Sequence, residues 1–207
     1  MTLGVSLATL QARSAECAAL IASAHRADAA GGNLFSASER EMITTAAFLN
    51  TFKLWEGFLE ESMSKYLSGK RPIGGGYVRK RASPASEDAA KAMLVGVMKF
   101  FDYANHDYVR KIAGIYFDGG RPFEPHISSV FTDLSDLRIM RNAAAHISST
   151  TQASLEALAQ RIFSTPQPNI TLYEMLLRSD PRSAAGETVF ASYQTKLLAT
   201  AELIARG

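Results

Sequence analysis

Residues 47–66, AFLNTFKLWEGFLEESMSKY, carry a large apolar side chain at every third or fourth position. Because an α-helix completes a turn every ~3.6 residues, this spacing places the apolar side chains on one face. The repeating positions are Phe48, Phe52, Trp55, Leu59, Met63 and Tyr66. Ser36 or Ser38 can cap the start of the helix, and Gly69 can end it. The stretch therefore predicts a long core helix over about residues 38–68, with its apolar face buried.

Helical periodicity continues along the rest of the chain, and no segment shows the alternation of a half-buried strand. Glycine and proline clusters separate the helical segments. Further helices are expected over about residues 5–29, 87–101, 106–117, 127–147, 153–163, 171–177 and 186–205. Of these, the helix over 127–147 is the second core helix. We therefore predict an all-α fold.

Length and composition limit the class of protein. The chain has 207 residues, enough for one domain with a real core, and we predict a single domain over residues 1–207. The formal net charge is only +2, so contact with a nucleic acid must come from local basic patches. The single cysteine, Cys17, cannot form a disulfide within the chain. No Cys/His spacing matches a zinc site, so no metal and no cofactor are expected.

The start of the chain lacks the basic residues and long apolar run of a secretory leader. No run approaches the roughly 18 apolar residues that a membrane span needs. We therefore expect a cytoplasmic protein with no membrane contact.

Two charged residues lie on apolar helix faces. Glu56 follows Phe52 by one helical turn, and Arg141 follows Leu137 by one turn. Because a buried charge without a partner is costly, each residue should find one, and the simplest inference is that the two helices pack and the two residues meet. An ordinary ion pair that fixes helix register explains the same pattern.

The segment Arg141-Asn142-Ala143-Ala144-Ala145-His146 places Asn142 and His146 on one helix face, with Arg141 one position away. Cleavage of RNA without a metal needs a base for the 2′-hydroxyl, an acid for the leaving 5′-oxygen and a cation for the phosphorane. Histidine can act as acid or base near neutral pH, and arginine binds phosphate oxygens through two N–H groups. A symmetric dimer would bring two such histidines together. Alternatively, His146 is a helix-capping or surface residue.

The same segment resembles the Arg-x(4–6)-His signature of the HEPN superfamily, and residues 47–61 resemble the first core helix of standalone bacterial HEPN proteins of the RiboL-PSP type. This resemblance implies an up-down helical bundle with extra N- and C-terminal helices, a homodimer and, in many members, an RNA-cutting toxin or phage-defence effector. It implies that Arg141 and His146 are the catalytic pair, contributed by two protomers to a composite site. It gives Asn142 a supporting role and makes Glu56 the acid that orients Arg141. The alanine run at 143–145 departs from members with a larger apolar residue there.

The glycine-rich loop over about residues 70–86 is strongly basic. Its basic residues are Lys70, Arg71, Arg79, Lys80 and Arg81, and Tyr77 lies among them. Such a loop can contact an RNA backbone near the dimer cleft, or it can be an ordinary solvated basic loop. Its three glycines lack the Gly-Lys-Ser/Thr of a nucleotide-binding loop.

The other three histidines, His25, His106 and His126, have no partners at metal-ligand spacing and are expected at the surface or at helix ends. Trp55, on the apolar stripe, is expected in the core.

Three functions remain open. The first is a metal-independent endoribonuclease of HEPN type, acting as a toxin or defence effector under an antitoxin or regulatory protein. The second is a catalytically silent HEPN module that binds RNA, a nucleotide or a protein partner. The third is an unrelated helical adaptor with Arg141 in a plain ion pair.

Overall fold

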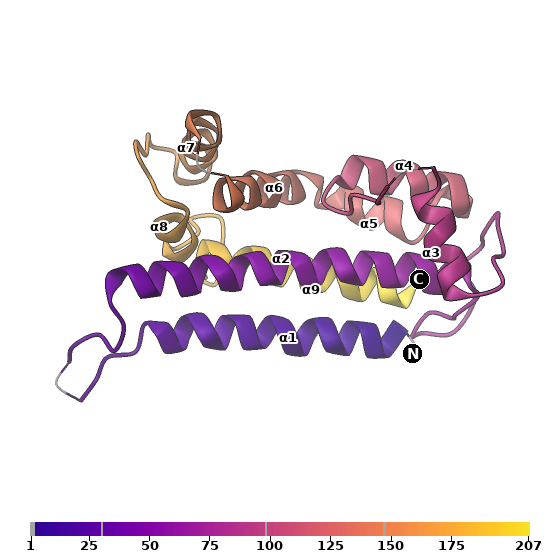
Figure 1. The fold of residues 1–207 in the computed structure, drawn as a ribbon, viewed down its shortest axis with the longest axis horizontal. Helices are drawn as coiled ribbons and strands as arrows, with labels where there is room; N and C mark the ends of the chain where they lie inside the picture. The colour runs from indigo at the N-terminus through magenta and orange to yellow at the C-terminus, as the bar shows by residue number, and fades with distance from the viewer. Residues whose placement is uncertain (1–2, 30, 98, 147) are drawn as a thin grey trace. The chain divides into compact units, whose positions relative to one another are not determined.

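The computed structural model describes residues 3–29, 31–97, 99–146 and 148–207 (Figure 1). Within these ranges every regular element is a helix, and β pairing is confined to isolated bridges. The elements are α1 (Leu3–Ala24), α2 (Ala37–Leu67), α3 (Glu87–Val95), α4 (His106–Tyr116), the short 3-10 helix η1 (Asp118–Gly120), α5 (Phe123–Ser129), α6 (Phe131–Ala145), α7 (Ser149–Phe163), α8 (Leu172–Leu177) and α9 (Val189–Arg206). The predicted all-α fold is confirmed; its assignment to the HEPN type stays a prediction.

The apolar stripe of α2 lies where its spacing placed it. All six side chains of the stripe are at most 2% exposed, and Trp55 is fully buried in the core as expected. Ser36 caps the helix: its hydroxyl accepts from the Glu39 backbone N–H at 3.3 Å, and the Glu39 carboxylate accepts from the Ser36 N–H at 2.8 Å. This reciprocal pair satisfies backbone donors that the first turn leaves free.

Several predicted helix boundaries are wrong: α1 ends at Ala24 rather than near residue 29, and α3 ends at Val95 rather than near residue 101. The helix expected over 127–147 is two helices, because Val130 has a non-helical backbone and separates α5 from α6. The first of these helices also begins earlier than expected, because α5 starts at Phe123 rather than near residue 127. At the other end α6 stops at Ala145, and residue 147 lies outside the described residues.

The chain divides into two compact units. The first comprises Met1–Ala12, Leu54–Leu134 and Lys196–Gly207; the second comprises Arg13–Lys53 and Ser135–Thr195. The single domain predicted over residues 1–207 stays a prediction.

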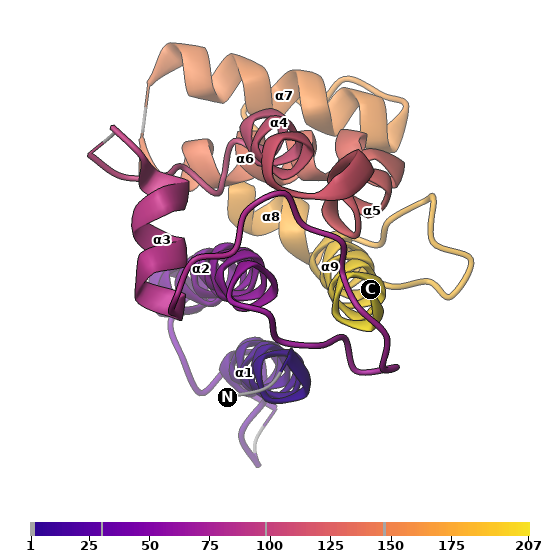
Figure 2. The same ribbon diagram turned by 90° about the vertical axis from the view of Figure 1, so that its right-hand side faces the viewer.

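In the first unit, α4, η1 and α5 pack against one another. Phe117 and Phe123 are fully buried there, with ring centroids 5.2 Å apart. The basic loop runs past the C-terminal end of α9 (Figure 2), where the Ile73 N–H donates to the Ala205 carbonyl at 2.9 Å. These contacts give the loop a defined path.

His106 is buried in the first unit, so a surface position is excluded, although the residue does lie at a helix end as the alternative expectation had it. It is 4% exposed, and its Nε2 accepts a hydrogen bond from the indole N–H of Trp55 at 3.0 Å. His106 is the first residue of α4 and lies one turn before the buried Val109, which places it on the buried face of that helix. His25, in contrast, hydrogen-bonds the Ile21 carbonyl at the end of α1, as a capping residue does.

In the second unit, α7 crosses α6 (Figure 2) and both bury their apolar faces. The fully or almost fully buried side chains of this unit include Phe48, Phe52, Leu137, Met140, Leu155, Leu158, Met175, Leu176 and Val189. They come from α2, α6, α7, α8 and α9, so one core holds five helices together.

Candidate functional site

The Arg-Asn-x-x-x-His segment forms the last turn of α6 and the residue after it. Arg141 and Asn142 are half-buried, whereas His146 is exposed directly beyond Ala145. The His146 N–H donates to the Asn142 carbonyl at 2.9 Å, which continues the helical hydrogen bonding by one residue. The predicted spacing of one turn between Asn142 and His146 is therefore present.

The start of α7 fixes the backbone of His146. The Thr151 hydroxyl lies 2.7 Å from the His146 carbonyl oxygen and can donate to it. The Ser148 hydroxyl accepts from the Thr151 N–H at 3.2 Å, and the Ser148 N–H donates back to the Thr151 hydroxyl at 3.1 Å. This capping box starts α7 four residues earlier than predicted, and it joins the candidate histidine to a stable helix end.

His146 also lines a groove in the second unit. The groove has a volume of about 580 Å³ and is formed by side chains of α2, α6, α7 and α8. Its apolar side chains include Met42, Leu49, Ala143, Ala144, Leu155 and Leu172, and its polar side chains include Glu41, Thr45, His146, Gln152 and Tyr173. The groove was not predicted, because it joins four helices that are distant in sequence.

Arg141 lies about one helical turn before His146, but it does not line the groove. Its guanidinium Nη1 donates to the Asn142 side-chain oxygen at 3.3 Å. The structure therefore gives Asn142 the local role of holding the arginine. Glu56 is half-buried on α2 and belongs to the first unit, whereas Arg141 belongs to the second. Their pairing stays a prediction.

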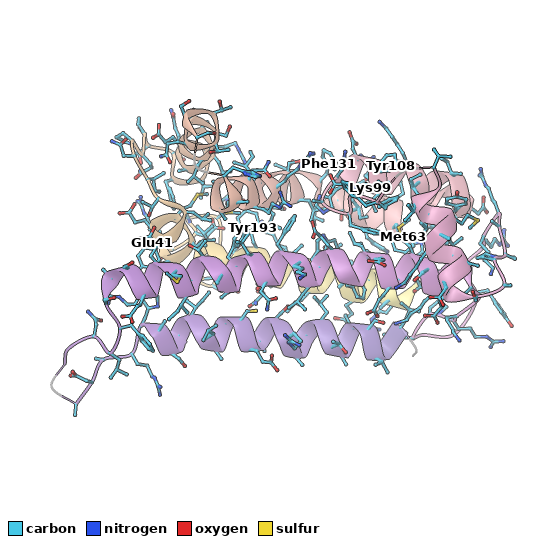
Figure 3. All side chains as sticks on the ribbon, viewed as in Figure 1. Glu41, Met63, Lys99, Tyr108, Phe131 and Tyr193 are labelled. Atoms are coloured by element: carbon cyan, nitrogen blue, oxygen red, sulfur yellow. The ribbon has the colours of Figure 1, made fainter. Side chains whose placement is uncertain are left out.

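A buried network of charges, absent from the sequence predictions, links α6, α7, α9 and the segment before α9. Asp136 of α6 is 2% exposed; it pairs with Arg161 of α7 and accepts from the Tyr193 hydroxyl at 2.6 Å. Tyr193 belongs to α9, and its side chain reaches toward α6 (Figure 3). Arg182 reaches Asp136 at 3.9 Å and binds Asp180 through two hydrogen bonds of 2.8 and 2.9 Å. Asp136 lies three residues after Asp133 on α6, and no sequence pattern distinguished the buried acid from its neighbour.

The network changes the acidity of two of its members. Burial by itself would raise the pKa of Asp180, but hydrogen bonds from the Arg182 side chain and backbone and from Ser192 lower it to about 2. The pKa of Tyr193 is raised, first by burial and then by its hydrogen bond to the Asp136 carboxylate. The first shift favours the ionised carboxylate of Asp180, and the second favours the neutral phenol of Tyr193.

The basic loop belongs to the first unit, and four of its five basic side chains have partners. Arg71 stacks on the Tyr77 ring at 4.4 Å, and Lys80 donates to the Leu67 carbonyl at the end of α2. The longer ion pairs, each at 4.0 Å, are Lys70 with Glu87 and Arg81 with Asp118. Among the described residues, Arg79 has no side-chain hydrogen bond or ion pair.

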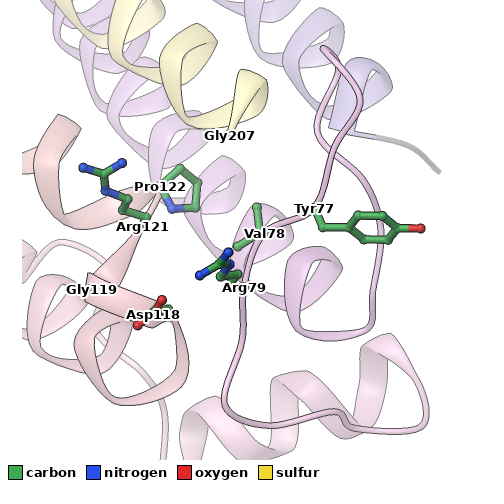
Figure 4. Close-up of a pocket in the computed structure, with 8 residues that line it drawn as sticks. All are labelled: Tyr77, Val78, Arg79, Asp118, Gly119, Arg121, Pro122 and Gly207. Atoms are coloured by element: carbon green, nitrogen blue, oxygen red, sulfur yellow. The ribbon is translucent and has the colours of Figure 1, made fainter.

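Arg79 lines a second pocket of about 450 Å³ between the loop and the turn at η1 (Figure 4). The other lining residues are Tyr77, Val78, Asp118, Gly119, Arg121, Pro122 and Gly207. The Tyr77 ring points away from Arg79 (Figure 4), so the two do not form a common stacking surface.

In the part of the chain that the structure describes, no group of three or more His, Cys, Asp or Glu side chains is arranged to hold a metal ion. Among the same residues, no helix is both long and apolar enough to cross a membrane. Comparisons with protein-family models, with curated proteins and with solved structures found no match. The resemblance of two sequence segments to HEPN proteins therefore stays a prediction.

Proposed function

We propose that this protein is a metal-independent endoribonuclease of HEPN type, with Arg141 and His146 as its catalytic residues. The observation that carries the proposal is the position of His146. Its imidazole is exposed at the end of α6, it lines a groove large enough for a nucleotide, and its backbone is held by Thr151. Arg141 and Asn142, one turn earlier, supply a cation and an amide close to it in the chain.

The reaction would use the 2′-hydroxyl of the RNA as its nucleophile. One imidazole takes the 2′-hydroxyl proton as the 2′-oxygen bonds to phosphorus, and a second imidazolium gives a proton to the 5′-oxygen as the P–O5′ bond breaks. The guanidinium stabilises the negative charge on the pentacoordinate phosphorus. The products are a 2′,3′-cyclic phosphate and a free 5′-hydroxyl.

The motif supplies one histidine per chain, whereas the reaction uses an acid and a base. A homodimer that brings two copies of the motif together would supply both, and this is the assembly we expect. The HEPN resemblance adds the expectation of a toxin or defence effector controlled by an antitoxin or regulatory protein. In the basic loop, Arg79 is the side chain best placed for a phosphate contact, since the other four are engaged.

The test is incubation of the purified protein with total RNA and with tRNA in the presence of EDTA. Wild type should cut, and the fragments should end in 2′,3′-cyclic phosphates. His146→Ala should reduce cleavage to background, and Arg141→Ala should reduce it by about a hundredfold or more.

Two matched variants separate the chemistry from general damage. His126→Ala removes another histidine, which is half-buried on α5, and Arg138→Ala removes an exposed arginine one turn before Arg141 on the same helix. Both should cleave like wild type. Equal cleavage by wild type and His146→Ala would assign the activity to other residues or to a contaminant. RNA binding without cleavage would favour the catalytically silent module.

A further inference from the structure

We propose that the groove beside His146 is a nucleobase subsite, and that the base it takes is guanine. The inference adds a base-binding site to the proposed ribonuclease. It rests on that proposed function, because only an RNA substrate makes a nucleobase the ligand. It assigns the RNA base next to the cut phosphodiester to a site built by α2, α6, α7 and α8 of a single chain.

The size and walls of the groove fit one base. A volume of about 580 Å³ lies within the range of roughly 300–1,000 Å³ that small-ligand sites occupy. Met42, Leu49 and Leu155 provide apolar surface from α2 and α7, and the small Ala143 and Ala144 leave room beside α6. Unstacked bases bind between such apolar and aromatic side chains. The proposal thus explains the alanines at 143 and 144, because larger side chains there would fill the groove.

Two polar side chains on the groove, Glu41 and Gln152, can offer a ligand only hydrogen-bond acceptors. Among the described residues, the Glu41 carboxylate has no hydrogen bond or ion pair. The Gln152 amide nitrogen donates to the Glu156 carboxylate at 2.9 Å and to the Ile170 carbonyl at 3.1 Å. Because both of its N–H groups are used, Gln152 has only its carbonyl oxygen left for a ligand.

These acceptors select the base. The Watson–Crick edge of guanine carries two neighbouring N–H donors, which match the two oxygens of a carboxylate. Adenine, cytosine and uracil do not present two adjacent N–H donors, so each would leave part of the Glu41 carboxylate unpaired. Glu41 is exposed in the free protein, and a base bound in the groove would cover its carboxylate. An acceptor that is covered without receiving a donor costs free energy, and that cost is the source of discrimination.

The lining also excludes phosphate as the occupant. It contains no lysine and no arginine, and its one acidic residue would repel an anion. The base therefore occupies the groove, and the phosphodiester attached to it lies at the His146 end, about one helical turn after Arg141. This arrangement puts the reacting phosphate where the proposed chemistry needs it.

The first experiment measures binding without cleavage. The isotope-labelled full chain is titrated with guanosine, inosine, adenosine, cytidine and uridine 5′-monophosphates and followed by nuclear magnetic resonance. Guanosine monophosphate should bind tightest and shift the amide signals of Thr45, Ala143 and Gln152. Inosine monophosphate, which lacks the exocyclic amino group, should bind more weakly than guanosine monophosphate.

Two variants assign the contacts. Glu41→Gln should weaken guanosine monophosphate binding about tenfold and leave adenosine monophosphate binding unchanged. Met42→Ala, at a side chain that is 69% exposed and so unimportant for folding, should weaken binding of all the nucleotides. The matched control is Glu16→Gln on α1, which removes only an exposed ion pair with Arg13 and should leave every affinity as in wild type.

Two binding results would overturn the subsite: no preference for guanine, or a preference for guanine that survives Glu41→Gln. A third result would do the same. If dilution of the protein without nucleotide shifts the same amide signals, a second copy of the chain fills the groove. Parallel cleavage assays keep the two proposals apart. Cleavage that depends on His146 without guanine binding overturns the subsite alone. Guanine binding without cleavage overturns the ribonuclease alone.

Discussion

Asp136 is a single buried residue that connects three helices. Its carboxylate is buried on α6 and joins an arginine of α7 to the Tyr193 hydroxyl of α9. A carboxylate in such a place is tolerated only because its partners replace the water that it loses. The three helices that meet there include the one that carries the candidate active-site histidine.

Removing that charge should destabilise the protein. We expect Asp136→Asn to lower the free energy of unfolding by about 1–3 kcal/mol, because Arg161 and Arg182 lose the negative charge they face and one of the two acceptor oxygens becomes an amide donor. Urea denaturation followed by circular dichroism measures this change. Asp133→Asn is the matched control: Asp133 pairs with Lys196 at 2.6 Å, but the two side chains are 22% and 36% exposed, so its loss should cost less than about 1 kcal/mol. Equal effects of the two substitutions would contradict the importance given to burial.

Asp180 makes stability depend on pH. Its pKa is lowered from 3.8 to about 2 in the folded protein, so it contributes stability that is present above pH 3.8 and is lost as the pH falls toward 2. Asp180→Asn should be less stable than wild type at neutral pH, and its unfolding free energy should change less between pH 4 and pH 2. Denaturation midpoints measured across this range test the slope. A variant that follows the wild-type pH dependence would show that other carboxylates set it.

The sequence predicted single residues well where a repeating pattern placed them. The stripe from Phe48 to Tyr66 is buried as its spacing required, and Trp55 is in the core. His106 and Asp136 were missed because a polar residue at a buried helix position gives no sign of its partner in one-dimensional sequence. Their partners, Trp55 and Tyr193, are 51 and 57 residues away.

At the scale of elements, the junction of α6 and α7 decides where His146 lies. Helix α6 ends at Ala145 and α7 begins at Ser149, so only a few residues separate the two helices. Thr151 belongs to the first turn of α7, yet its side chain contacts the His146 carbonyl. The hydroxyl that caps one helix therefore also positions the residue that follows the other.

Thr151→Val removes that hydroxyl while keeping the shape of the side chain. We expect a loss of about 1 kcal/mol in stability from the capping box, and a several-fold lower kcat for RNA cleavage with little change in KM. Thr150→Val, at the exposed neighbouring position, should change neither quantity. A Thr151 variant with lower stability but wild-type kcat would limit the hydroxyl to helix capping.

Elements were predicted better than their boundaries. Each α-helix of the described residues had a counterpart in the sequence pattern, but α5 and α6 were predicted as one helix and α7 was predicted too short. The reason is local: the break at Val130 and the cap at Ser148 depend on backbone conformations that hydrophobic periodicity does not encode. The groove was unpredictable for a different reason, since it exists only where side chains of four separate helices meet.

At the scale of the whole molecule, the proposal requires two chains. Each chain brings one Arg141 and one His146, and the reaction uses two histidines. Under this proposal the dimer is part of the chemistry, and activity should depend on how chains are paired.

Mixing experiments test this dependence. Wild type is unfolded and refolded together with increasing amounts of His146→Ala protein at constant total concentration. If both histidines of a pair are needed, cleavage should fall with the square of the wild-type fraction, since only pairs of wild-type chains are active. A linear fall would show that each chain works alone. Arg138→Ala in place of His146→Ala should leave the activity unchanged.

The buried contact between Trp55 and His106 has a practical consequence. Trp55 is the only tryptophan in the chain, and both residues belong to the first unit. Tryptophan fluorescence therefore reports the unfolding of the first unit, whereas far-ultraviolet circular dichroism reports the helices of both. Superimposable melting curves from the two signals would mean that the chain loses its structure as one cooperative body, as a single domain does. The native protein thus carries its own optical probe, placed in one of its two halves without any chemical label.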